Sequence, residues 1–202
     1  MTASPPPRLK PLGLLLLMTG AYAVLVGNWQ APVALRFSVG ALNPAAFALG
    51  VAGLPLAMLA TTARLEARSL RWAARALAGF LLAPGLLLGG VAGLNALGGL
   101  AMGGRDPGFE RLHDVPVGAY HLAVYRWNGG ATTDFEIVAR QERVLLPGLR
   151  LVRDLEWFTK SDTAMVVRLG PDSVRVIVPW YGSYHQGAEV REYRLRSLVG
   201  TR

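Results

Sequence analysis

The fold is decided by Ala76–Met102, which reads ALAGFLLAPGLLLGGVAGLNALGGLAM and contains no charged side chain. A helix needs about 20 mostly apolar residues to cross the roughly 30 Å of hydrocarbon in a bilayer. Two further stretches, Pro11–Asn28 and Ala41–Thr61, are also uncharged. A helix of a soluble bundle needs a polar face, and these stretches have almost none. We therefore predict three transmembrane helices.

The charged residues are distributed unevenly along the chain of 202 residues. Charged side chains make up 17% of the sequence, whereas an ordinary soluble domain carries about 25%. Residues 1–104 hold eight of them and residues 105–202 hold the other 26. We expect a membrane domain over residues 1–104 and an extracytoplasmic, β-rich domain over residues 105–202.

The orientation follows from the basic residues, because short cytoplasmic segments are enriched in Lys and Arg. The segment between the first two spans has only Arg36. The basic residues on the other side are Arg8, Lys10, Arg64, Arg68, Arg71 and Arg75. This pattern predicts a multi-pass protein of the cytoplasmic (inner) membrane, with the N-terminus in the cytoplasm and residues 105–202 outside it.

The first span has an alternative interpretation as a cleaved signal peptide. A basic start precedes an apolar core and an Ala21-x-Ala23 pattern, as in such peptides. The apolar run continues through Val24, Leu25 and Val26, which favours an uncleaved helix. Cleavage would leave two crossings and the same location for residues 105–202.

Three glycines of the third span, Gly85, Gly89 and Gly93, recur every four residues and share one helical face. Such a face lets another helix approach closely. We favour packing within the chain, with a homo-oligomer or a membrane-protein partner as the alternative.

The four arginines between the second and third spans fall in one sector of a helical wheel. They predict either an interfacial helix that binds anionic membrane lipids or a loop that only sets orientation. The net charge of +8 lies mainly in residues 1–104. Because residues 105–202 contain no basic patch with interleaved aromatics, we do not expect nucleic-acid binding.

After Arg105 the hydrophobic pattern alternates, which is typical of half-buried antiparallel strands. Short turns rich in Gly, Pro, Asn and Asp separate the alternating runs. We predict a small antiparallel domain, either a sandwich or a curled sheet. Its expected strands span residues 120–127, 133–143, 150–158, 164–169, 173–178 and 190–198.

The segment Val124–Phe135, VYRWNGGATTDF, carries a resemblance. It resembles the Gly-Ala-Thr-Thr β-hairpin signature of a family of uncharacterised, membrane-anchored bacterial proteins with a domain of unknown function. The resemblance covers residues 120–178 and implies a fold and a membrane location, with no activity. The hairpin motif (Gly129, Gly130, Thr132 and Thr133) suits a turn with positive φ and side-chain caps. The alternative is a ligand or partner site.

The segment from Trp180 to Gly187, WYGSYHQG, is the most unusual of the outer domain. A loop with several aromatic and polar side chains can bind a ligand or a partner protein. The candidate residues are Trp180, Tyr181, Ser183, Tyr184 and His185. The alternative is that the aromatics cover one end of the sheet or lie at the lipid interface.

Motifs for catalysis are missing from the sequence. The chain has no cysteine, and the spacing of its three histidines matches no metal motif. It has no Gly-x-Ser-x-Gly, no P-loop and no Gly-x-Gly-x-x-Gly. We expect no enzyme activity, catalytic residue, metal or cofactor. We expect a β-domain for protein or envelope contacts, or alternatively an accessory or sensor subunit whose β-domain binds a small ligand.

Overall fold

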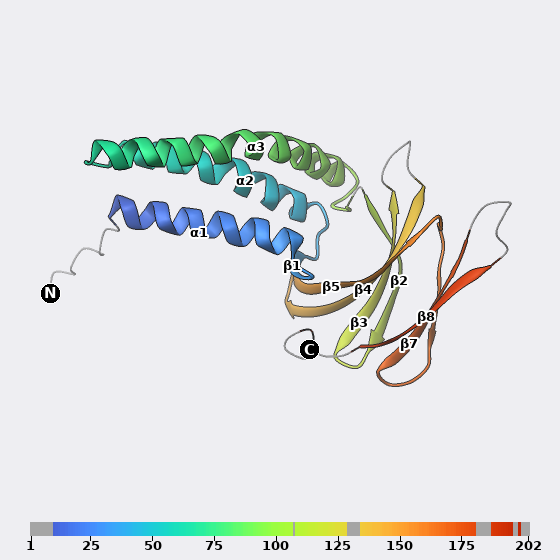
Figure 1. Ribbon diagram of the computed structural model, residues 1–202. Helices are drawn as coiled ribbons and strands as arrows, with labels where there is room; N and C mark the ends of the chain where they lie inside the picture. Colours follow the sequence, from blue (N-terminus) through green and yellow to red (C-terminus); the bar gives the residue numbers. More distant parts are fainter. Residues whose placement is uncertain (1–9, 107, 129–133, 181–186, 196–197, 199–202) are drawn as a thin grey trace. The chain divides into compact units, whose positions relative to one another are not determined.

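The computed structural model describes residues 10–106, 108–128, 134–180, 187–195 and 198. Within these residues three helices and eight strands follow one another in the order α1, β1, α2, α3 and β2 to β8 (Figure 1). Three long apolar helices are therefore followed by antiparallel sheets, as the sequence predicts. The chain divides into two compact units, each described separately below.

The helices are α1 (Pro11–Gln30), α2 (Leu42–Thr62) and α3 (Arg68–Ala101). All three are long and apolar enough to cross a membrane. α3 begins eight residues before the predicted span, and at 1.5 Å per residue its 34 residues extend about 51 Å. It is therefore longer than the roughly 30 Å of hydrocarbon in a bilayer.

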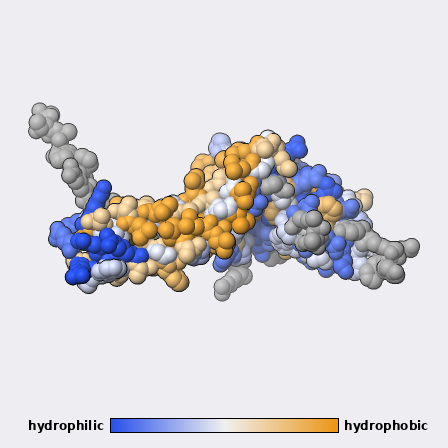
Figure 2. All heavy atoms as spheres, turned by 90° about the horizontal axis from the view of Figure 1, so that it is seen from above, coloured by the Kyte–Doolittle hydropathy of each residue, from blue (hydrophilic) through white to orange (hydrophobic). Residues whose placement is uncertain are grey.

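The first unit comprises the chain up to Trp29 together with Pro44–Asn95. Leu15 of α1, Met58 of α2 and Ala78 of α3 form one buried cluster. A second cluster includes Phe47, Val51 and Ala92. Other large apolar side chains point outward, and Figure 2 shows them as an orange band along the helices. Helices that are apolar on all sides are typical of membrane spans.

The glycine face of α3 lies partly against α2. A Cβ atom at Gly85 would overlap the carbonyl oxygen of Val51, and one at Gly89 would lie 3.3 Å from the carbonyl oxygen of Ala48. The third glycine, Gly93, has open space where a Cβ atom would be. α2 of the same chain thus packs against two of the three glycines, Gly85 and Gly89.

The larger sheet has five antiparallel strands in the order β1-β5-β4-β3-β2. A tight turn joins β4 and β5 at Pro147 and Gly148, and the positive φ of 86° at Gly148 suits glycine. The strands are β1 (Val33–Phe37), β2 (Phe109–Val117), β3 (Tyr120–Asn128), β4 (Phe135–Leu146) and β5 (Leu149–Thr159).

A smaller sheet has the antiparallel order β6-β7-β8. Its strands are β6 (Met165–Arg168), β7 (Ser173–Pro179) and β8 (Ala188–Arg194). Val174, Val176 and Val178 are fully buried and form one core with residues of the larger sheet, including Leu122 and Ile137. The two sheets therefore pack through a shared core.

Two strands were not predicted. β1 lies between α1 and α2 and pairs with β5, far along the chain, so residues 30–43 belong to the same compact unit as the chain from Ala96 onward. β2 contains several charged residues and forms an edge of the larger sheet. Five residues between apolar helices carry too little alternation to indicate a strand, because the partner that orders them is distant in sequence.

The close approach of α2 and α3 makes one substitution informative. Alanine gains about 1 kcal/mol of helix propensity over glycine, but overpacking against a rigid backbone costs about 1–3 kcal/mol. We expect Gly85→Ala to lower the thermal unfolding midpoint of the full chain in mild detergent. Gly93→Ala, the matched control, should leave the midpoint unchanged or raise it. Equal shifts in both variants would contradict this packing.

Candidate functional site

The larger sheet has a polar face opposite the shared core, here named the charged face. Strand register places His121 beside Glu142, and Ala123 beside Arg140. The intervening Leu122 is buried in the shared core. Alternation therefore sends the odd-numbered side chains of β3 to the other face. Polar members of this face are Arg36, Arg111, Asp114, His121, Tyr125, Arg140, Glu142, Arg150 and Asp154.

Glu142 of β4 lies at the centre of the charged face, and only 5% of its side chain is exposed. The Tyr125 hydroxyl donates a hydrogen bond to its Oε1 at 2.6 Å. Arg111 and Arg150 donate to its Oε2 at 3.1 and 2.7 Å. Two cations and one hydroxyl thus compensate the cost of burying this carboxylate.

Tyr125 is neutral in this arrangement. Burial, together with the nearby Glu142 carboxylate, raises the pKa of Tyr125 to about 12. The hydroxyl therefore keeps its proton well above neutral pH and remains a donor to Glu142. Arg111 donates to the same hydroxyl oxygen at 3.1 Å from Nε, which joins three strands in one network.

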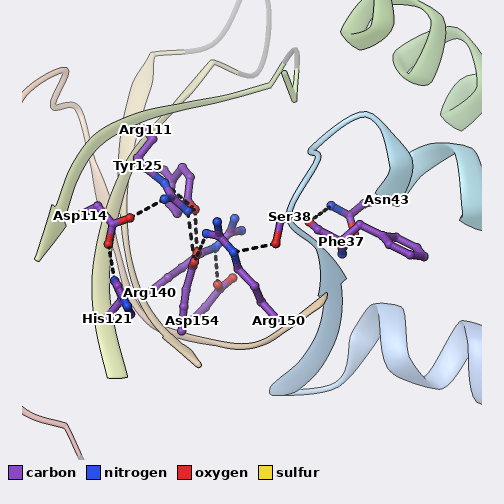
Figure 3. A network of polar contacts seen from close by, with 11 residues as sticks. Phe37, Ser38, Asn43, Arg111, Asp114, His121, Tyr125, Arg140, Arg150 and Asp154 are labelled. Carbon is purple, nitrogen blue, oxygen red and sulfur yellow. Dashed lines mark hydrogen bonds and ion pairs between the residues drawn. The ribbon is translucent and has the colours of Figure 1, made fainter. Parts of the chain in front are cut away.

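The network extends from Glu142 through Arg111 and Arg150, and Figure 3 labels these two arginines with the residues that they contact. On one side, Arg111 forms an ion pair with Asp114 at 2.6 Å, and Asp114 contacts Nδ1 of His121 at 2.8 Å. On the other side, Nε of Arg150 donates to Oγ of Ser38 at 3.0 Å. The charged face is therefore connected to the segment that leads from β1 to α2.

Aromatic side chains lie next to the charged network. The Arg140 guanidinium carbon lies 4.3 Å from the centroid of the Phe109 ring and 5.1 Å from that of Tyr125. Trp157 packs edge-on against Phe109 at 6.1 Å and against Trp127 at 5.8 Å. Because 43% of Trp157 is exposed, this aromatic cluster presents a large ring to the surroundings.

Burial shifts the pKa of Arg36 in β1 and the pKa of Asp106, which follows α3, in opposite directions. Burial lowers the pKa of Arg36, and the nearby Arg140 lowers it further, whereas Asp154 and Asp106 oppose the shift. Burial raises the pKa of Asp106, against the stabilising hydrogen bond from the amide of Gly108. An arginine remains charged despite such a shift, so Arg36 adds a cation to the charged face.

The predicted aromatic loop and hairpin motif fall mostly outside the described residues. This applies to Tyr181, Ser183, Tyr184, His185, Gly129, Gly130, Thr132 and Thr133. Trp180 is described: 40% of it is exposed, and its Nε1 donates to Glu189 at 3.1 Å.

The predicted basic stripe (Arg64, Arg68, Arg71 and Arg75) lies on the turn between α2 and α3 and on the first two turns of α3. Arg71 donates to the carbonyl oxygen of Leu65 at 3.0 Å from Nε. Arg75 donates to Oγ1 of Thr62 at 3.4 Å. Arg71 thus contacts the turn, whereas Arg75 contacts the last residue of α2, where cations are favoured. Arg64 and Arg68 are exposed.

Sequence reasoning did not find the charged face. The spacing of the histidines gave no motif, whereas pairing of β2 with β3 holds Asp114 against His121. Nε2 of His113 contacts the carbonyl oxygen of Ala164 at 2.7 Å. Among the described residues, no three His, Asp or Glu side chains come together as metal ligands would. The available signal was the run of polar residues from Arg140 to Arg143 in β4.

The pairing of Glu142 predicts a stability effect. Glu142→Gln removes the charge that neutralises two arginines, so we expect the free energy of unfolding to fall by about 2–3 kcal/mol. Glu192→Gln is the control, because Glu192 forms an exposed ion pair with Arg175 and such pairs contribute about 0–1 kcal/mol. Denaturation of the full chain in detergent, followed by tryptophan fluorescence, measures both. Equal losses would contradict a central role for Glu142.

No protein-family model, curated protein or solved structure matches the chain. The resemblance to the uncharacterised membrane-anchored family therefore stays a prediction.

Proposed function

We propose that the chain is an integral protein of the cytoplasmic membrane whose β-domain lies outside the cytoplasm and contacts another protein or the cell envelope. The single observation that carries the membrane topology is the pairing of β1 with β5. This pairing requires residues 33–37 and 149–159 to be on the same side of the bilayer. That condition is met if α1, α2 and α3 each cross the bilayer, because two crossings then separate β1 from β5. The N-terminus is then on the opposite side.

The distribution of basic residues supports this topology. Arg36 is the only basic residue in the connection between α1 and α2. Its side chain belongs to the charged face. The basic stripe begins in the turn between α2 and α3 and continues on the first two turns of α3, and it is suited to the cytoplasmic surface and its anionic lipids. Both observations favour the same orientation.

The charged face is the contact surface that we propose. Trp, Tyr and Arg are enriched among residues that dominate protein–protein binding energies, and here Trp157, Tyr125 and Arg140 lie together. The face carries carboxylates among its arginines, as Glu142 and Asp154 show. Charges of both signs favour a protein of complementary pattern over a polyanion.

An accessory or sensor subunit of a membrane complex is the second candidate function. The observation that favours it is the open space beside Gly93, where α3 has no neighbour within 4 Å of a Cβ position. A helix of a partner membrane protein can approach closely at such a residue. A small ligand on the β-domain would complete this role.

The orientation can be tested because the chain has no cysteine. We expect a membrane-impermeant maleimide to label Val190→Cys, in exposed β8, on intact spheroplasts of an expressing bacterium. Ala63→Cys, between α2 and α3, should react only after the membrane is permeabilised. The reverse pattern, or labelling of both sites in intact spheroplasts, would refute the proposed topology.

The contact surface can be tested with a photo-crosslinking amino acid in place of Trp157. Irradiation of membranes should give a covalent adduct with a distinct protein, and Arg140→Ala should reduce its yield because Arg140 holds the aromatic cluster. The same crosslinker in place of Val190, which has a similar exposure of 48%, is the control. Equal yields from both positions, or none from position 157, would contradict this use of the charged face.

A further inference from the structure

The turn between β4 and β5 is apolar and exposed, an uncommon combination for a tight turn. Val144, Leu145 and Leu146 end β4 and are 54%, 43% and 62% exposed. Strand pairing places Leu146 beside Leu149, and Leu149 beside Phe37 of β1. These residues, named here the apolar tip, are Leu35, Phe37, Val144, Leu145, Leu146 and Leu149.

The apolar tip is fixed close to the first turn of α2. The amide of Phe37 donates to Oδ1 of Asn43 at 2.7 Å, and Nδ2 of Asn43 donates back to the Phe37 carbonyl oxygen at 3.1 Å (Figure 3). The Ser38 amide donates to the carbonyl oxygen of Gly148 at 2.9 Å. All these residues belong to one compact unit, so the tip and residue 43 keep a fixed spacing.

The length of α2 places its first turn at the bilayer surface. Its 21 residues extend about 32 Å, which matches the roughly 30 Å of hydrocarbon. Leu42 is therefore at one border of the hydrocarbon if α2 spans the membrane. The hydrogen bonds from Phe37 to Asn43 then hold the apolar tip at that same border.

A basic residue that flanks the tip suits the polar part of a bilayer. Arg143 precedes Val144 and is exposed. Apolar side chains that enter the acyl region, with basic residues at headgroup level, are typical of segments that bind at a membrane interface. A contiguous exposed apolar patch also marks an interaction site rather than ordinary surface.

We propose that the apolar tip inserts into the outer leaflet of the membrane that α2 crosses, so that the β4–β5 hairpin binds the lipid surface directly. The inference rests on the proposed membrane function. Leu145, Leu146 and Phe37 enter the acyl region, while Arg143 lies among the phosphate groups. The larger sheet is thereby held at the bilayer by a second contact besides the helices.

Single nitroxide labels on the full chain in nanodiscs of phosphatidylcholine and phosphatidylglycerol test this proposal. Leu145→Cys reports on the tip, and Leu146→Cys gives a second reading if the first variant folds poorly. Leu169→Cys, in the turn between β6 and β7, is the matched control, because Leu169 is 44% exposed. Leu87→Cys, on the outward side of α3, reports on the membrane span.

Collision of each label with oxygen, which partitions into lipid, and with a water-soluble nickel chelate gives the depth. We expect labels at positions 145 and 87 to collide more with oxygen, and the label at 169 to collide more with the chelate. If the label at 87 collides more with oxygen while the label at 145 collides more with the chelate, this result overturns the tip proposal and leaves the proposed membrane function intact. If 145 is immobilised and shielded from both reagents, a protein covers the tip, which also overturns it. If 87 reads as water, the membrane function itself fails, and the tip proposal with it.

Discussion

The backbone hydrogen bonds between β1 and β5 constrain the rest of the architecture. They join residues 33–37, between the first two helices, to residues 149–159, well beyond the third. If α1, α2 and α3 cross a bilayer as we propose, that bilayer cannot separate two strands of one sheet, so this pairing links the threading of the helices to the fold of the larger sheet. It also brings Arg36 to the charged face and fixes Phe37 beside the β4–β5 turn.

Electrostatics and packing cooperate around Glu142. A nearly buried carboxylate is costly unless its partners surround it, and here they come from three different strands, β2, β3 and β5. Such a network favours one strand register, because a slip of one residue would move Glu142 into the shared core. The same network places Arg140 against the aromatic rings, so the arrangement that stabilises the sheet also shapes its exposed surface.

Much of the fold could be predicted from the sequence, and the reasons are local. The long uncharged runs predict helices because a single continuous segment of sufficient length is enough to indicate each one. Pro147-Gly148 predicts a turn because only certain residues suit its backbone angles. β1 was missed because its order depends on a partner more than a hundred residues away. The charged face was missed for the same reason, since Arg111, Tyr125 and Glu142 meet only through strand pairing.

The position of β1 at one edge of the larger sheet has a consequence for biogenesis. The backbone donors and acceptors of β1 leave the ribosome long before β5 is synthesised, so the strand must wait without its partner. Contacts between such distant segments form slowly, and until then the unpaired edge can join with foreign strands. The late arrival of residues 149–159 therefore sets the moment at which β1 first gains a partner of its own chain.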